Sequence, residues 1–215
     1  MRVFLFALLL LLVSCEASLQ KEEPEINQKI QVQKGRNGND TLTVGGGCYW
    51  CVEAVYELMD GVVDVSAGFT GGSRINPSYE EVCMGITGHA EVTQIIFDST
   101  QTSVKEILKV FFTVHDPTTL NRQGNDVGTQ YRSAIFYKSK NQKEIAELII
   151  RELNKENTYP SKIITEVSPL KIFYRAKEDH QDYYANNSED AYCRMVIQPK
   201  IEKFEKVFKK AKKEN

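Results

Sequence analysis

The sequence predicts an α+β sandwich, in which helices pack against a sheet within one domain. Strand-like and helix-like segments interleave from residue 41 onward, which is the pattern of domains whose helices and strands share one core. The 215 residues suit one domain, and a hydrophobic content of 41% is enough for a real core. The 27 basic and 29 acidic residues give a net charge of −2, which argues against a general nucleic-acid-binding protein.

The first residues are typical of an export signal. Arg2 precedes an apolar run from Val3 to Val13, which is too short to cross a bilayer because about 20 residues are needed. A basic start, a short apolar run and a small residue at its end are typical of a secretory signal. The end, Leu12-Val13-Ser14-Cys15, resembles a bacterial lipobox, so we predict a signal peptide over residues 1–14 and a lipid on Cys15. We therefore expect an exported bacterial lipoprotein anchored to a membrane. The alternative is a short buried element, but the polar sequence that follows gives it little to pack on.

Residues 15–40 are polar and lack apolar periodicity, which predicts a flexible tether before a folded domain over residues 41–215. The domain opens with a strand pattern over 41–44 that Gly45-Gly46-Gly47 stops. Apolar residues at i, i+3, i+4 and i+7 then predict a helix over 48–59. The next elements are predicted in the order strand 62–67, loop 68–77, a short helix capped by Ser78, and strand 91–97.

The second half continues the alternation. Ser103 and Glu106 have the spacing of a capping box, which predicts a helix that continues through Phe112. The loop over 115–128 is long, and long loops in compact domains are usually functional. The remaining elements are predicted in the order strand 133–137, helix 141–153, strands 163–167 and 170–174, and a Lys-rich helix over roughly 199–213. We expect the last helix to pack through its apolar side, with its lysines in solvent rather than on phospholipid.

The segment Gly45-Gly46-Gly47-Cys48-Tyr49-Trp50-Cys51 carries the strongest chemical signal. Cys48 stands where the predicted helix begins, and the unpaired amides of a helix N-terminus favour a thiolate there. We therefore predict that Cys48 is a nucleophile with a lowered pKa. Cys51 lies one helical turn away, within disulfide reach, so the pair is interpreted as redox-active.

Other roles for this segment fit the sequence less well. A structural zinc site would need a second ligand pair, and only Cys83, Cys193 and scattered histidines remain, so we predict no metal site. A phosphate-binding loop would need Gly-Lys-Ser or Gly-Lys-Thr after the glycines, and it is absent. A plain structural disulfide would leave the helix N-terminus without a role. A general thioredoxin-like disulfide oxidoreductase also has a C-x-x-C pair and stays open as an alternative, as does a lipoprotein without catalytic activity.

Several longer blocks resemble one known family, the peptide methionine sulfoxide reductases of form A. The resemblance covers about residues 41–208 and rests on blocks that follow one another in order: Gly47–Trp50, Gly71-Gly72, Asn76–Cys83, Thr87–Val92, His115–Ser133, His180–Tyr183 and Tyr192-Cys193. It implies a ferredoxin-like mixed sheet with helices in two layers. It also implies thiol-dependent reduction of methionine-S-sulfoxide, free or in proteins, which repairs oxidative damage.

The resemblance assigns a role to each matching residue. Cys48 matches the nucleophile that attacks the sulfoxide sulfur, and Glu91 matches the acid that protonates the departing oxygen. A carboxyl group can do this near neutral pH only when burial raises its pKa. The remaining matches are tyrosines that bind the substrate oxygen (Tyr79 and Tyr131), a carboxylate that orients the site (Asp126), and an aromatic pair that holds the substrate methyl group (Tyr49 and Trp50).

The resemblance also implies a second thiol that resolves the Cys48 sulfenic acid. Cys193 matches the C-terminal resolving cysteine of the family, in a segment that must then be mobile. Cys51 stands where many relatives have glycine; we favour Cys51 as the resolving thiol, and a relay through both thiols is also open. Cys83 is expected to be a buried packing residue, and His89, His115 and His180 are expected to be structural. The implied reductant is thioredoxin or a similar protein, with no cofactor, and nothing in the sequence indicates an oligomer, so a monomer is expected.

Overall fold

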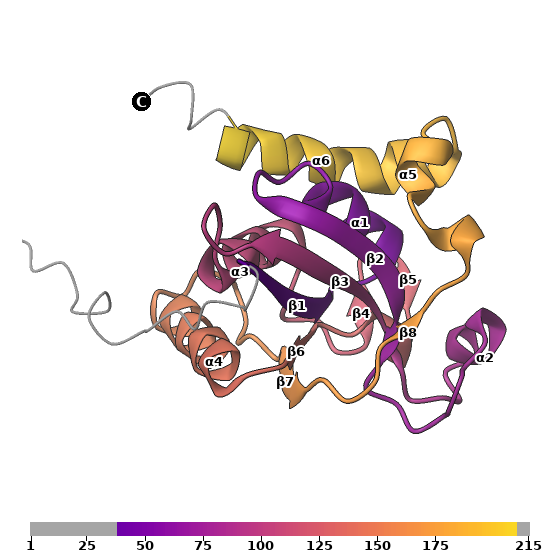
Figure 1. The fold of residues 1–215 in the computed structure, drawn as a ribbon, viewed down its shortest axis with the longest axis horizontal. Coiled ribbons are helices and arrows are strands. Elements are labelled where there is room, and N and C mark those ends of the chain that lie inside the picture. The colour runs from indigo at the N-terminus through magenta and orange to yellow at the C-terminus, as the bar shows by residue number, and fades with distance from the viewer. Residues whose placement is uncertain (1–37, 210–215) are drawn as a thin grey trace, which may run out of the picture. The chain divides into compact units, whose positions relative to one another are not determined.

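The computed structural model describes residues 38–209 of the chain (Figure 1). The predicted signal peptide, Cys15 and the predicted tether up to residue 37 lie outside the described residues. Within residues 38–209, no helix is both long enough and apolar enough to cross a membrane.

One six-stranded sheet forms the centre of the domain, and its strand order is β7-β6-β1-β3-β2-β8. β6 and β7 run parallel, whereas every other neighbouring pair is antiparallel. The mixed sheet confirms the predicted α+β class. The strands are β1 (Asn39–Gly45), β2 (Val62–Thr70), β3 (Ala90–Asp98), β6 (Ala134–Tyr137), β7 (Glu166–Pro169) and β8 (Tyr174–Arg175).

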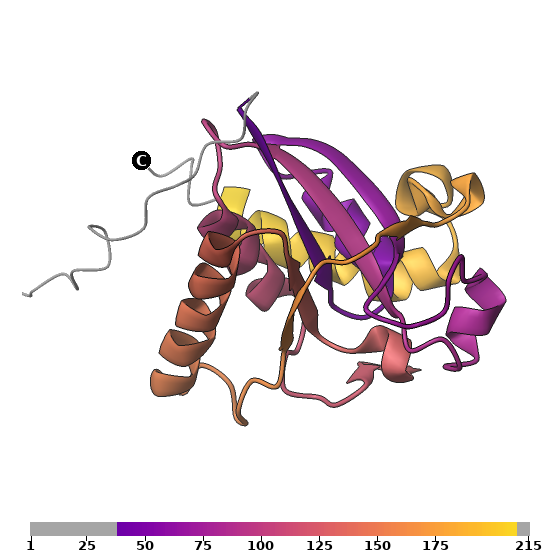
Figure 2. The ribbon, with the colours of Figure 1, turned by 60° about the horizontal axis from the view of Figure 1, so that its bottom comes forward.

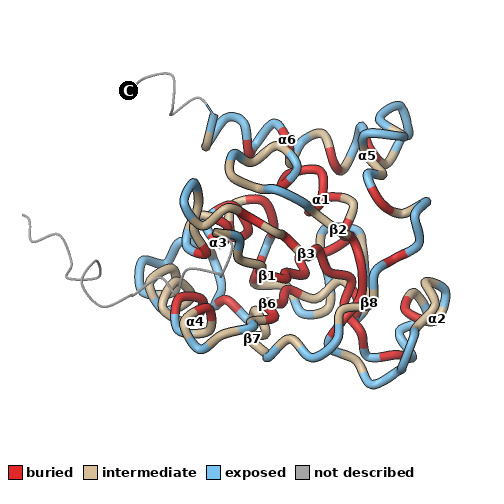
Figure 3. The backbone as a smooth tube through the Cα atoms, viewed as in Figure 1, coloured by how far each residue is buried: buried red, intermediate tan, exposed pale blue. Residues whose placement is uncertain are grey.

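The helices gather on one face of this sheet. α1 (Tyr49–Tyr56) and α3 (Val104–Val114) both contact α6 (Gln198–Phe204), and α4 (Lys140–Lys155) packs against α3, β6 and β7. In Figure 2 the chain between β7 and β8 crosses the other side of the sheet. There Leu170 and Phe173 pack on Ala90, Val92, Ala134 and Phe136. Figure 3 shows that the buried residues concentrate in the central strands and in the helical turns that face them.

Two short helices flank the sheet. α2 (Tyr79–Cys83) begins at a complete capping box, in which the Ser78 side chain accepts from the Glu81 backbone N–H and the Glu81 side chain accepts from the Ser78 backbone N–H. This confirms the capping predicted from the S-x-x-E spacing. α5 (Tyr183–Asn186) follows Asp182, whose φ of 52° places it in the left-handed region.

Four element predictions need correction. β2 continues to Thr70 because Gly68 and Phe69 pair with both β3 and β8. Residues 170–173 form no strand; the side chains of Leu170 and Phe173 cover the sheet face instead, and only Tyr174–Arg175 joins the sheet as β8. The predicted loop over 115–128 contains a small two-stranded ribbon of β4 (Arg122–Gln123) and β5 (Asp126–Val127). The C-terminal helix begins earlier than predicted, at Cys193, and is described up to Lys209, with wider π-type turns on either side of α6.

Candidate active site

Cys48 stands at the junction between β1 and α1. β1 ends at Gly45, and Cys48 is the N-cap residue of α1, immediately before Tyr49. Gly47 has a φ of +94°, and a Cβ atom there would lie 2.6 Å from Cγ of Gln123. A glycine is therefore required where the loop that carries β4 packs against this turn. The turn leaves Cys48 only 7% exposed.

Glu91 on β3 supplies a buried acid beside the start of α1. Its side chain is 2% exposed, and Oε2 accepts a hydrogen bond of 3.2 Å from the backbone N–H of Tyr49. Burial raises the pKa of Glu91 to about 8, although the Tyr49 N–H counteracts part of this rise. The carboxyl group is therefore mostly protonated at neutral pH and holds a proton that it can donate.

Cys48 and Cys51 form a thiol pair on the first turn of α1. The backbone N–H of Cys51 donates to the Cys48 carbonyl at 3.1 Å, and the two thiols are hydrogen-bonded to each other. Burial raises the pKa of the Cys48 thiol well above its ordinary value, and Cys51 and Glu91 add to the rise. The pKa of Cys51 is lowered to about 7, mainly by the hydrogen bond from Cys48.

This distribution corrects the prediction of a lowered pKa for Cys48. The amides of the helix N-terminus favour a thiolate, but the closed site removes the thiol from water, and desolvation of the charged form dominates. Of the two thiols in the substrate-free protein, Cys51 therefore loses its proton more readily than Cys48.

Tyr79 and Tyr131 reach the same site from separate elements. Tyr79 is the first residue of α2, and Tyr131 ends a 3₁₀ turn over Thr129–Tyr131. Burial raises the pKa of each hydroxyl, and the charge of Glu91 adds to the rise at both. Both phenols therefore stay neutral hydrogen-bond donors. The Cys83 thiol, which was expected to be a buried packing residue, is half-buried and hydrogen-bonded to Tyr79.

Tyr192 connects Asp126 to the thiol pair. Its hydroxyl donates to Oδ2 of Asp126 at 3.0 Å and lies 3.7 Å from Sγ of Cys51. Tyr192 belongs to one of the blocks that resemble the family, but its role was not predicted. The signal in the sequence that could have indicated this role is the position of Tyr192 immediately before Cys193, a predicted resolving thiol.

Cys193 follows Tyr192 in a helical segment that packs against α1. Its side chain is fully buried, and burial raises the pKa of its thiol, with smaller contributions from Asp190 and Cys51. Cys48, Cys51, Cys83 and Cys193 are all free thiols in this structure. Cys48 is thus hydrogen-bonded to Cys51, and Cys51 interacts electrostatically with Cys193.

The predicted aromatic pair is covered by the segment around His180. Tyr49 is 1% exposed, and its hydroxyl bonds to Nδ1 of His180 at 2.9 Å. Trp50 stacks on Tyr183 with ring centroids 3.7 Å apart and an interplanar angle of 10°. His180 and Tyr183 were quoted in a family block, but sequence reasoning gave neither a place at this site.

His89 and His115 are structural, as predicted. Nδ1 of His89 accepts from the Gly72 N–H at 3.0 Å, and Nε2 bonds to the Arg74 carbonyl at 2.7 Å. Burial lowers the pKa of His115 to about 4, so its ring is neutral while it bonds to Ser133 and to the Phe111 carbonyl.

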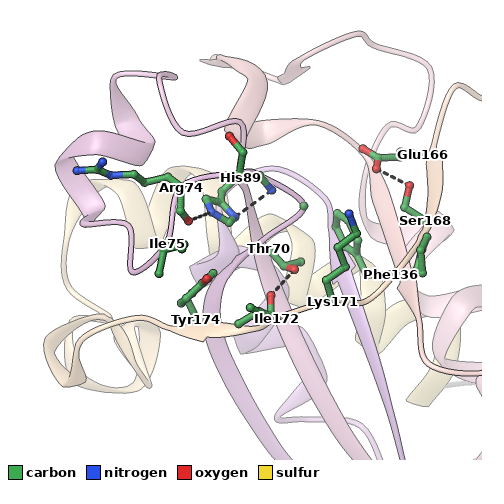
Figure 4. Close-up of a pocket in the computed structure, with 14 residues that line it drawn as sticks. Thr70, Arg74, Ile75, His89, Phe136, Glu166, Ser168, Lys171, Ile172 and Tyr174 are labelled. Carbon is green, nitrogen blue, oxygen red and sulfur yellow. Dashed lines mark hydrogen bonds between the residues drawn. The ribbon is translucent and has the colours of Figure 1, made fainter.

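A cavity of about 350 Å³ lies beside His89 (Figure 4). Its labelled lining includes Thr70, Phe136 and Lys171, and Thr70 is fixed by a 2.6 Å hydrogen bond to the Ile172 carbonyl. Neither cysteine of the thiol pair lines it, nor does Glu91. This cavity is therefore separate from the thiol chemistry.

A thiol pair at a helix start, a protonated buried carboxyl and two neutral phenols define a thiol-dependent oxidoreductase that can protonate a departing oxygen atom. Residues 40–213 match the sequence model of the family described as peptide methionine sulfoxide reductase. A relative from Saccharolobus solfataricus, named peptide methionine sulfoxide reductase MsrA, is 53% identical over 169 residues, which are 79% of this chain and 94% of the relative.

Solved structures agree with this match. The structure of methionine sulfoxide reductase A of Corynebacterium diphtheriae is 37% identical with a TM-score of 0.63, covering 74% of this chain and 80% of that one. Mxr1 from Saccharomyces cerevisiae in its reduced form is 34% identical with a TM-score of 0.68, covering 77% and 94%. The chain belongs to the peptide methionine sulfoxide reductase family, and it is an enzyme that reduces methionine sulfoxide to methionine through thiols. The thioredoxin-like alternative is not favoured.

Proposed function

We propose that the enzyme acts on the S epimer of methionine sulfoxide, free or in oxidised proteins, through a sulfenic acid on Cys48. The Cys48 sulfur attacks the sulfoxide sulfur, Glu91 donates its proton to the sulfoxide oxygen, and the phenols of Tyr79 and Tyr131 hold that oxygen. The oxygen is transferred to Cys48 and the proton that Cys48 loses replaces the one donated by Glu91, so that thiol and sulfoxide become sulfenic acid and methionine. The observation that carries this proposal is the pKa of Glu91, about 8, at a carboxyl group only 2% exposed beside Cys48. Tyr49 and Trp50 bind the methyl group, and Asp126 orients the site through Tyr192.

An assay with separated substrates tests this function. Methionine-S-sulfoxide, methionine-R-sulfoxide and a scrambled disulfide protein are each supplied with dithiothreitol. The S epimer alone should yield methionine, and Cys48→Ser should abolish that yield. Reduction of the disulfide protein without methionine formation would instead make this chain a general disulfide oxidoreductase.

Cys51 is the resolving thiol in this proposal. Its pKa of about 7 keeps a large thiolate fraction next to Cys48 at neutral pH, and the thiolate is the attacking form. Attack on the Cys48 sulfenic acid forms the Cys48–Cys51 disulfide and releases water. Cys193 is buried next in line and can then attack Cys51, which moves the disulfide to Cys51–Cys193 and frees Cys48 as a thiol.

Separate serine variants distinguish the two resolving thiols. With one equivalent of sulfoxide and no reductant, wild type should contain a Cys48–Cys51 disulfide by peptide mass spectrometry, and Cys51→Ser should retain sulfenic acid that a dimedone probe captures. Cys193→Ser should still form the first disulfide. The assignment is wrong if Cys51→Ser keeps full thioredoxin-driven turnover while Cys193→Ser loses it.

The reductant and the location complete the proposal. A protein disulfide formed in each cycle needs a dithiol donor, so we propose an exported thioredoxin-like protein as the electron donor. The lipobox-like Leu12–Cys15 supports attachment of the protein to a membrane through a lipid on Cys15, facing away from the cytoplasm. Cys15→Ser should move the protein from the membrane fraction to the soluble fraction, and an unchanged distribution would refute the anchor.

A further inference from the structure

Three carboxylates converge on the side of α1 away from its thiols. We propose that Glu53, Glu57 and Asp182 bind a hard divalent cation, Ca²⁺, which fastens the segment around Asp182 to α1. One carboxylate oxygen from each residue can be chosen so that all three lie within 4.8 Å of one another. Glu53 and Glu57 stand one helical turn apart on α1, whereas Asp182 arrives from a distant part of the chain just before α5.

Glu53 provides an independent indication of a ligand. The residue is only 1% exposed, and its Oε2 accepts a 3.4 Å hydrogen bond from the Tyr183 N–H. Oε1 is fully buried and has no hydrogen-bond partner among the residues that the structure describes. A buried carboxylate oxygen is strongly unfavourable unless it is paired, protonated or coordinated to a metal. This oxygen belongs to the residue that joins Glu57 and Asp182 in the cluster.

The charges around the cluster are of one sign. Burial raises the pKa of Glu53 and Glu57 to about 7. The charges of Glu57 and Asp182 add to the rise at Glu53, and a hydrogen bond with Asp182 together with its charge adds to the rise at Glu57. A cavity of about 260 Å³ adjoins Glu57 and Asp182; its remaining lining consists of Asp64 and three valines. An acidic cavity of this size leaves room for the water ligands that a cation needs in addition to three carboxylates.

The donor set selects the type of cation. All three side chains offer carboxylate oxygen, which suits Ca²⁺ and Mg²⁺, whereas zinc sites in proteins are usually built with nitrogen or sulfur. Ca²⁺ accepts six to eight oxygen ligands in irregular arrangements, whereas Mg²⁺ demands a near-ideal octahedron. Ligands from a helix and from a separate segment therefore fit Ca²⁺ better.

The position of Asp182 gives this site a consequence for the enzyme. Asp182 lies between Gln181, whose side chain bonds to the Ala67 backbone, and Tyr183, whose ring stacks on Trp50. A cation held by Asp182 and α1 would therefore fix Tyr183 against Trp50. Ca²⁺ takes no part in the sulfur chemistry; it sets how firmly the aromatic wall of the site is closed.

The fluorescence of Trp50 reports how firmly Tyr183 is held against it, because Trp50 is the single tryptophan of the sequence. The experiment titrates Ca²⁺ into the chelator-treated full-length protein at about pH 8, above the pKa of about 7 of the two glutamates, and follows Trp50 fluorescence. We expect a saturable change with a midpoint of roughly 0.1–1 mM, the range of weak extracellular Ca²⁺ modules, and a weaker response to Mg²⁺. Ca²⁺ has no affinity for thiolates, so coordination by Cys48 and Cys51 does not contribute.

Charge-neutral variants test the ligands. Glu57→Gln and Asp182→Asn remove exposed carboxylates and should each raise the midpoint at least about tenfold, as should Glu53→Gln. The matched control is Glu144→Gln, which removes an exposed carboxylate from α4 and should leave the midpoint unchanged. The absence of a saturable response in wild type, an equal response in Glu57→Gln and Asp182→Asn, or tighter binding of Mg²⁺ would overturn the proposal.

Discussion

Two buried glutamates next to α1 show how neighbours decide what a carboxyl group does. Glu91 is 2% exposed and accepts the backbone N–H of Tyr49, and Glu53 is 1% exposed and accepts backbone N–H groups of Tyr183 and Asp182. Burial raises the pKa of both, to about 8 for Glu91 and about 7 for Glu53. Glu91 faces the thiols and phenols of the active site, where it can donate its proton to a substrate, whereas Glu53 faces two other carboxylates. Burial alone therefore does not identify a catalytic acid.

Amide substitution at the two glutamates gives the largest expected contrast. Glu91→Gln removes the proton that must reach the sulfoxide oxygen, so the single-turnover rate of methionine formation should fall by about 10²–10⁴, the usual contribution of a general acid. Glu53→Gln should change that rate by no more than a few-fold, because Glu53 contacts no reacting group. Rapid-quench measurement with one equivalent of methionine-S-sulfoxide, without reductant, isolates this step. Equal losses in the two variants would show that burial of either carboxyl serves only the fold.

The pH dependence sharpens the same contrast. Attack needs the Cys48 thiolate together with protonated Glu91, and the pKa of Cys48 is raised in the substrate-free site. The rate should therefore rise with pH as Cys48 ionises and level off above about pH 8, where loss of the Glu91 proton offsets further ionisation of Cys48. The check is the single-turnover rate across roughly pH 6–10, where each unit below the Glu91 pKa should cost about tenfold. The rate of Glu91→Gln should keep rising past about pH 8, and the rate of Glu53→Gln should level off as that of wild type does.

The raised pKa of Glu91 should also make the free energy of unfolding depend on pH. Its pKa is raised on folding from 4.5 to about 8, so the folded state holds the proton more tightly than the unfolded chain. The associated stability is fully present below about pH 4.5 and is lost as pH rises through about 8. The free energy of unfolding of wild type, from urea titrations, should therefore decrease relative to Glu91→Gln between these pH values, by up to a few kcal/mol. A constant difference across that range would contradict the raised pKa.

Local patterns predicted most of the elements and the place of Cys48, because helix starts and caps depend on residues close together in the sequence, whereas Glu91 was predicted from the family resemblance. The capping box at Ser78 and Glu81, and the position of Cys48 at the start of α1, each depend on neighbouring residues and were predicted. The strand assigned to 170–174 failed because apolar alternation does not distinguish a strand from a coil that covers a sheet.

The missed parts of the site come from distant segments. Tyr183 on Trp50, Tyr192 on Asp126, and Asp182 beside Glu53 meet only after the chain folds back on α1. The pKa of Cys48 was mispredicted for a related reason. The favourable helix N-terminus is visible in the sequence, whereas the extent of burial depends on the whole domain.

The smallest expected effect concerns the stack between Tyr183 and Trp50, the link between the surroundings of Glu53 and the substrate site. Tyr183→Ala removes a ring 3.7 Å from Trp50, and an aromatic pair contributes about 0.5–1.5 kcal/mol beyond the area it buries. If that energy helps to shape the methyl-binding wall, KM for methionine-S-sulfoxide should rise a few-fold to about tenfold, with kcat nearly unchanged because Glu91 and Cys48 are untouched. Tyr183→Phe is the matched control, since it keeps the ring and loses only the hydroxyl that donates to Asp190. Steady-state kinetics separate KM from kcat, and a loss in kcat for Tyr183→Ala would instead place Tyr183 among the groups that support the chemical step.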